Sequence, residues 1–124
     1  MNEARRAERT FLRSLGWAIS GLRRTFEREP NFRRELFIGA LAVALTLWLR
    51  APLAPILVMC GLVLSLELIN SAVEAAVDLA SPQHHELAGA AKDAAAGAVL
   101  IASLASVFVG LAVLGPPLWQ RLFG

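Results

Sequence analysis

Three long apolar stretches occupy most of the chain beyond residue 35, and they restrict it to very few folds. They are Leu36–Leu49, Ile56–Leu66 with its continuation through Glu67 to Leu79, and Leu87–Leu114. A helix needs about 20 mostly apolar residues to cross a bilayer. The composition agrees, since 56% of the 124 residues are hydrophobic and 18% are charged, against about 45–50% and about 25% in soluble domains. The sequence therefore predicts an all-α integral membrane protein with three transmembrane helices.

The segment before these stretches has the pattern of an amphipathic helix. Its apolar residues recur at helical spacing: Phe11, Leu12, Leu15, Ile19, Leu22 and Phe26. Arginines occupy the other faces, and such a helix lies well on an anionic membrane surface. A helix of a soluble bundle is the alternative, which the following apolar stretches disfavour. We predict a surface helix over 4–29 and transmembrane helices over 32–49, 54–79 and 87–114, in one membrane-embedded domain of residues 1–124.

The charges predict how the chain is oriented in the membrane. Residues 1–35 contain nine Arg against five Glu, within a net charge of +2 for the whole chain. Because cytoplasmic segments are enriched in Lys and Arg, the N-terminus is predicted to be cytoplasmic. The first apolar stretch is short, so Arg33, Arg34 and Glu35 should lie in the membrane interface, and Trp48 fits an interfacial anchor at the other end.

An unusual set of acids interrupts the second apolar stretch. Glu67, Asn70, Glu74 and Asp78 are spaced by three, four and four residues, which places them within an arc of roughly 80° on one helix face. A carboxylate that faces lipid is costly, so this face must meet protein, water or a cation. A structural polar seam is the alternative, but like charges repel unless a positive group lies among them. The acids therefore favour a functional site.

The predicted topology brings other charges to the same level of the membrane. Glu29 lies where the surface helix meets the first span, and Glu86, Lys92 and Asp93 open the third span from the cytoplasmic side. Several carboxylates with one Lys and one Asn suit Mg²⁺ and a phosphate ligand, because Mg²⁺ binds one or two carboxylates together with phosphate oxygens. The chain contains neither G-x-x-x-x-G-K-[ST] nor G-x-G-x-x-G, so a nucleotide would not bind in a P-loop.

Two linked motifs resemble the prokaryotic diacylglycerol kinase family. They are E-L-I-N-S-A-V-E-A-A-V-D at Glu67–Asp78 and H-E-L-A-G-A-A-K-D at His85–Asp93, supported by G-L-R at Gly21–Arg23 and E-P-N-F-R-R-E at Glu29–Glu35. The resemblance covers nearly the whole chain from about residue 10. It implies a homotrimer of three-helix protomers with sites between subunits. It also implies transfer of the γ-phosphate of MgATP to a lipid hydroxyl at the cytoplasmic surface, here that of diacylglycerol to give phosphatidic acid.

The same resemblance implies roles for individual residues. Glu67 matches the catalytic base and Asn70 its neighbour in the site. Glu29 and Glu74 match the ligands of the ATP-bound Mg²⁺. Nucleotide-binding positions are matched by Trp17 (a Tyr in a relative), Glu29, Glu74, His85, Lys92 and Asp93. Lipid-binding positions are matched by Arg23, Phe32, Arg33, Glu35, Trp48 and Glu67.

Two other functions also fit these residues. Part of the same family phosphorylates undecaprenol and shares the core motifs. A small proton-coupled transporter would also use buried membrane acids, although the outer halves of the first two spans hold almost no polar residues. The expected partners are ATP, a membrane lipid and further copies of the chain, with no nucleic acid. The protein is expected to lie in the bacterial cytoplasmic (inner) membrane, which its chain would cross several times.

Overall fold

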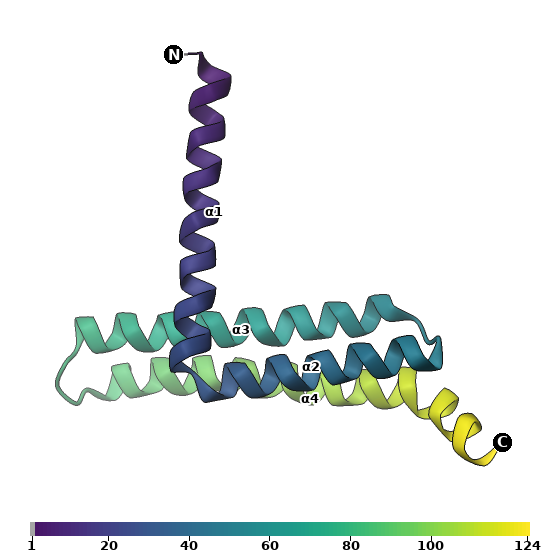
Figure 1. The fold of residues 1–124 in the computed structure, drawn as a ribbon. Coiled ribbons are helices and arrows are strands. Elements are labelled where there is room, and N and C mark those ends of the chain that lie inside the picture. Colours follow the sequence, from purple (N-terminus) through teal and green to yellow (C-terminus); the bar gives the residue numbers. More distant parts are fainter. Residues whose placement is uncertain (1) are drawn as a thin grey trace. The chain divides into compact units, whose positions relative to one another are not determined.

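The computed structural model describes residues 2–124 and contains four helices in this range, with no strand. They are α1 (Glu3–Arg28), α2 (Pro30–Leu49), α3 (Leu53–Ala80) and α4 (Glu86–Phe123) (Figure 1). The prediction of an all-α chain is therefore confirmed. The chain divides into two compact units, residues 1–30 and 31–124, which are described separately below.

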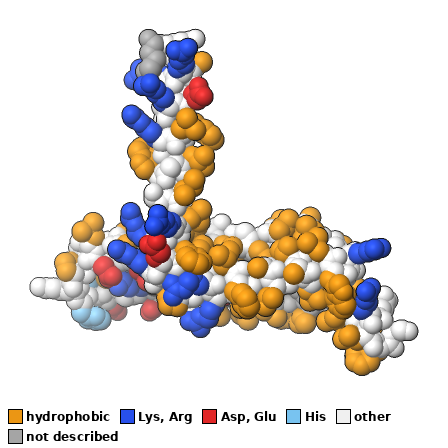
Figure 2. All heavy atoms as spheres, in the orientation of Figure 1, with side chains coloured by type: hydrophobic (Ala, Val, Ile, Leu, Met, Phe, Trp, Pro, Cys, Tyr) orange, Lys and Arg blue, Asp and Glu red, His pale blue; other side chains and the backbone are white. Residues whose placement is uncertain are grey.

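The first unit consists mainly of α1. Asn2 caps its start, with the side-chain oxygen accepting a hydrogen bond from the Ala4 N–H at 3.2 Å. The helix ends at Arg28 and is capped by Glu29, whose extended backbone (φ −106°, ψ 104°) fits a residue that precedes proline. No residue of α1 is buried, and its apolar side chains, such as Phe11 at 67% exposure, lie open beside the basic ones (Figure 2). Such a helix has both faces expected of a membrane-surface helix.

The second unit contains three helices. Of these, α3 and α4 run antiparallel, and their backbones approach each other most closely (Figure 1). Its core is small. The buried apolar residues are Phe32, Ile56, Val63, Ala102 and Leu114, with Thr46 and Glu67 as buried polar residues. Many large apolar side chains face outward instead, including Phe108 at 72% exposure. Exposed apolar area on this scale is typical of a surface that lipid or another protein covers.

Two of the described helices, α3 and α4, are long and apolar enough to cross a membrane. In α2, the charged residues Arg33, Arg34 and Glu35 lie near the start, so only Leu36–Leu49 is free of charge. By length and composition, α2 therefore falls short of the same standard. The second and third predicted spans, α3 and α4, therefore have the length and hydrophobicity expected of a membrane-crossing helix. That α2, the first predicted span, crosses the membrane stays a prediction.

Helix α4 continues past the predicted end at residue 114 to Phe123. Pro116 and Pro117 lie within it. Each proline lacks an N–H and bends a helix without necessarily ending it, and Figure 1 shows α4 changing direction near its C-terminal end. The sequence pattern placed the end of the span before these prolines, whereas the helix itself passes through them.

The connection between α2 and α3 is a tight turn with one unusual backbone angle. The Ala51 N–H bonds to the Thr46 carbonyl at 3.1 Å, and the Arg50 N–H bonds to the Leu47 carbonyl at 3.2 Å. These two bonds define a Schellman motif, which requires a left-handed residue after the helix. Arg50 takes this position with φ of 54°, where glycine is usual. The turn is therefore closed by a residue under backbone strain.

Candidate functional site

The acidic face of α3 extends from a buried position to an exposed one. Glu67 is 8% exposed, Asn70 and Glu74 are half-buried, and the side chain of Asp78 is 65% exposed near the helix end. At a rise of 1.5 Å per residue, Glu67 and Glu74 lie roughly 10 Å apart along the axis. The face therefore offers one carboxylate shielded from water and others that water and soluble ligands can reach.

A hydrogen bond links two members of this face. The Asn70 Nδ2–H donates to Glu74 Oε1 at 3.2 Å, within the half-buried part of α3. The Asn70 Oδ1 atom is buried, and no hydrogen-bond partner contacts it among the described residues. A buried amide oxygen without a partner is costly. Asn70 therefore presents an acceptor that a donor or a cation could satisfy.

The donor set on α3 fits a hard cation, although it does not form a complete protein cage. Within residues 2–124, no group of three or more His, Cys, Asp or Glu side chains is arranged to hold a metal ion. Mg²⁺ does not require such a group, because it retains waters and takes oxygens from bound phosphates. The Glu74 carboxylate and the unpaired Asn70 oxygen are donors of the kind Mg²⁺ prefers. The other predicted ligand, Glu29, belongs to the first unit.

A polar pocket of about 240 Å³ lies where α3 ends and α4 begins. Both histidines line it, together with Asp78 and Lys92. His85 caps α4, with its Nδ1 accepting a hydrogen bond from the Leu87 N–H at 3.1 Å, which fixes the ring at the pocket edge. Lys92 Nζ forms an ion pair with Asp78. Two predicted nucleotide-binding residues, His85 and Lys92, thus line one pocket, whereas Asp93 is exposed and lies outside its lining.

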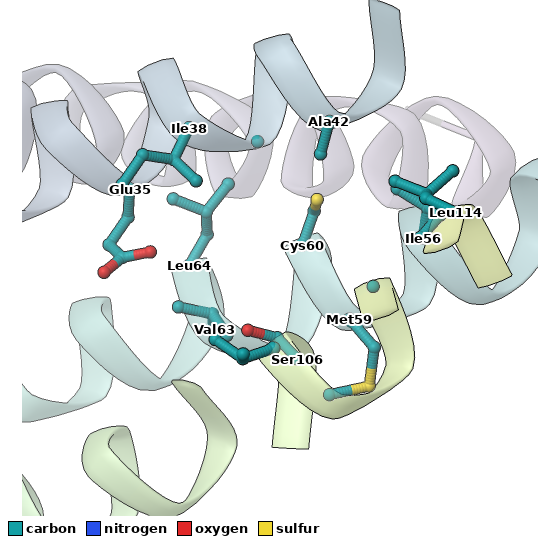
Figure 3. A pocket seen from close by; sticks show the side chains of 13 residues that line it. Glu35, Ile38, Ala42, Ile56, Met59, Cys60, Val63, Leu64, Ser106 and Leu114 are labelled. Carbon is teal, nitrogen blue, oxygen red and sulfur yellow. The ribbon is translucent and has the colours of Figure 1, made fainter. Parts of the chain in front are cut away.

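A second cavity, of about 160 Å³ and mostly apolar, lies between α2, α3 and α4. Figure 3 shows the Glu35 carboxylate from α2 at one end, and Ile56 and Leu114 at the other. Gly39 and Cys60 meet along its wall, and a Cβ added at Gly39 would lie 3.4 Å from the Cys60 Sγ. Glu35 is the one predicted lipid-binding residue that lines this cavity.

The remaining predicted lipid-binding residues lie elsewhere. Phe32 is buried at 4% exposure, and Arg33 is exposed in the same turn of α2. Trp48 lies at the other end of α2, where the Arg121 guanidinium stands 4.9 Å from its ring centroid. In the first unit, Arg23 pairs with Glu27 at 3.0 Å, and Trp17, predicted to bind nucleotide, is 71% exposed.

Sequence reasoning missed two side-chain pairings. The ion pair between Asp78 and Lys92 could have been anticipated, because opposite charges flank the short predicted turn between two antiparallel helices. The contact of Arg121 with Trp48 had no such signal. It depends on the direction that α4 takes after Pro116 and Pro117.

Two helices long and apolar enough to cross a membrane, one of which carries a row of acidic residues, are typical of helical membrane proteins. Comparison with known families is more specific, because the sequence pattern of prokaryotic diacylglycerol kinase matches residues 16–114. The chain belongs to the prokaryotic diacylglycerol kinase family. The prediction of membership in this kinase family is thereby confirmed.

Individual relatives carry two different names. A diacylglycerol kinase of Synechocystis sp. is 44% identical over 109 residues, covering 85% of this chain and 62% of the relative. The chain thus spans less than two thirds of that protein. The diacylglycerol kinase of Escherichia coli K12 is 37% identical over 99 residues, covering 77% of this chain and 81% of the relative. An undecaprenol kinase of Bacillus subtilis is 37% identical over 116 residues, covering 87% of this chain and 90% of the relative.

Proposed function

We propose that this protein is a MgATP-dependent lipid kinase that phosphorylates the hydroxyl of diacylglycerol, giving phosphatidic acid at the cytoplasmic face of the bacterial inner membrane. The proposal is carried by the α3 face, on which buried Glu67 lies within a few turns of Glu74 and Asn70. Family membership and the names of the Synechocystis and Escherichia coli relatives support it. The acceptor lipid would reach Glu67 from the bilayer, and ATP would reach Glu74 from water.

Glu67 serves as the proton acceptor in this proposal. A lipid hydroxyl is a weak nucleophile, so a carboxylate within hydrogen-bond reach must take its proton as the oxygen bonds to the γ-phosphorus. The bond from the γ-phosphorus to the bridging oxygen breaks, and ADP leaves with that electron pair. Burial of Glu67 excludes water that would compete as the acceptor. Phosphoryl transfer otherwise depends on positioning and charge neutralisation.

The other residues bind and orient ATP in this proposal. Glu74, oriented by Asn70, and Glu29 would hold Mg²⁺, which neutralises phosphate charge. Lys92, Asp93, His85 and Trp17 would contact the nucleotide. Arg23, Phe32, Arg33, Glu35 and Trp48 would contact the lipid, and the apolar cavity beside Glu35 would accept a short part of its chain.

Undecaprenol is the second candidate acceptor. The Bacillus subtilis relative bears the name undecaprenol kinase, and the comparison with it covers 90% of that protein. A polyprenyl alcohol and diacylglycerol both present a hydroxyl at the membrane surface, so the same carboxylate could serve either. A proton-coupled transporter, the candidate from another class, gains no support from a family whose relatives are named as kinases.

The proposed assembly is a homotrimer in which α2, α3 and α4 all cross the membrane and α1 lies on the cytoplasmic surface. The outward-facing apolar side chains of the second unit support burial against lipid or further copies. Arg33, Arg34 and Glu35 would lie in the interface, which would let the charge-free part of α2 reach across most of the bilayer.

One assay tests the proposed function. Full-length protein in mixed micelles is given γ-labelled ATP with Mg²⁺ and either diacylglycerol or undecaprenol. Transfer of label to diacylglycerol at the higher kcat/KM supports the proposal, and preference for undecaprenol selects the second candidate. Folded protein that labels neither lipid would rule out both.

A further inference from the structure

Asp78 and Lys92 form an ion pair that joins the last turn of α3 to the second turn of α4. Both side chains line the polar pocket that also holds His84 and His85. Lys92 has a role in the function proposed above, but Asp78 has none.

The pair is poorly suited to stabilising the fold. The side chains of Lys92 and Asp78 are 37% and 65% exposed, and exposed ion pairs contribute little to stability because water screens them. Helices α3 and α4 also pack closely and are joined by the short segment 81–85. Loss of the pair should therefore leave the helix pair intact, and its effect must be local.

The local effect is on the position of the Lys92 ammonium group. A lysine side chain is long and flexible, so its charge explores a large volume unless a partner holds it. The Asp78 carboxylate holds Lys92 Nζ at the pocket. An ammonium has three N–H donors, so one bond to Asp78 leaves two for another anion. The pair need not break for a phosphate to bind.

We propose that Asp78 is a positioning residue for ATP, which acts by holding Lys92 Nζ where two of its N–H groups can bind phosphate oxygens. This inference rests on the proposed function, in that the anion entering the pocket is taken to be the phosphate chain of ATP. A pre-positioned lysine lowers the entropy lost on binding. Asp78 therefore acts on nucleotide affinity and leaves the chemical step, which occurs at Glu67, almost unchanged.

The test measures binding and catalysis separately in the full-length protein. Binding of a non-hydrolysable ATP analogue with Mg²⁺ is titrated by calorimetry, and initial rates are measured with ATP and diacylglycerol. Asp78→Ala should raise both the Kd of the analogue and the KM for ATP by about tenfold, with kcat changed less than about threefold. Asp78→Glu, which keeps a carboxylate, should recover most of the affinity.

A double-mutant cycle identifies the route of the effect. In a Lys92→Ala background, Asp78→Ala should cause almost no further loss, because its effect passes through the lysine. Glu8→Gln is the control, since it removes one exposed carboxylate from α1 that belongs to no predicted site. It should change the Kd less than about twofold.

Several outcomes overturn the inference. A lower Kd in Asp78→Ala would show that the carboxylate repels ATP, and additive losses in the double variant would show that Asp78 does not act through Lys92. An equal shift in Glu8→Gln would show a general charge effect. If the wild type binds the analogue but labels no lipid, the proposed function fails alone and the Kd values still decide the role of Asp78. If the wild type binds no nucleotide, both fail.

Discussion

Asn70 donates its Nδ2–H to Glu74 Oε1 from one turn earlier on α3, and the Asn70 Oδ1 atom stays buried without a partner in the described chain. Residues four apart lie next to each other on a helix, so this contact needs no other element to form. It fixes the orientation of the amide and of the carboxylate together. The acidic face is therefore partly organised within one helix before any ligand arrives.

Replacement of Glu67 tests its role as the proton acceptor. Glu67→Gln keeps the size and hydrogen-bonding capacity of the side chain but removes the basic oxygen. We expect kcat to fall by about 10²–10⁴-fold, the usual loss for a general base, with little change in MgATP affinity. Initial rates and nucleotide titrations measure the two quantities. Loss of MgATP binding in this variant would assign Glu67 to the nucleotide instead.

Replacement of Glu74 should give the opposite pattern. Glu74→Gln removes a charged oxygen ligand but leaves an amide for Asn70 to contact. We expect weaker MgATP binding, because Mg²⁺ favours carboxylate oxygens, and partial recovery of activity as the Mg²⁺ concentration rises. Glu67→Gln is the matched control and should show no such recovery. If neither Glu67→Gln nor Glu74→Gln changes the reaction rate or MgATP binding, the acidic face is structural.

The sequence predicted the acidic face because helical periodicity depends only on local spacing. Glu67, Asn70, Glu74 and Asp78 share a face in any α-helix. Their individual contacts were not predictable in the same way. The pairing of Asp78 with Lys92 requires the packing of α3 against α4, and the contact between Trp48 and Arg121 requires the bend of α4. Placement of Glu29, a predicted metal ligand of the first unit, depends on packing beyond one helix and stays a prediction.

The oligomeric state can be measured directly. We expect a trimer in mild detergent, the assembly that the family resemblance implies, in which neighbouring copies cover part of the exposed apolar surface of the second unit. Light scattering corrected for bound detergent gives the protein mass, and cross-linking gives an independent count of subunits. A monomer that retains full lipid kinase activity would contradict this prediction.

The turn between α2 and α3 offers a test of stability that is independent of catalysis. Arg50 occupies the left-handed position of the Schellman motif with φ of 54°. A residue with a Cβ is less stable there by about 1–2 kcal/mol, whereas glycine is not penalised. Arg50→Gly should therefore stabilise the protein by about 1 kcal/mol, after allowance for the greater freedom of glycine in the unfolded chain. Thermal unfolding in detergent, followed by circular dichroism, should show a higher midpoint.

Ala51→Gly is the matched control, because Ala51 has no positive φ to relieve and the added freedom should lower the midpoint. A lower midpoint in Arg50→Gly would mean that contacts of the arginine side chain outweigh the backbone strain.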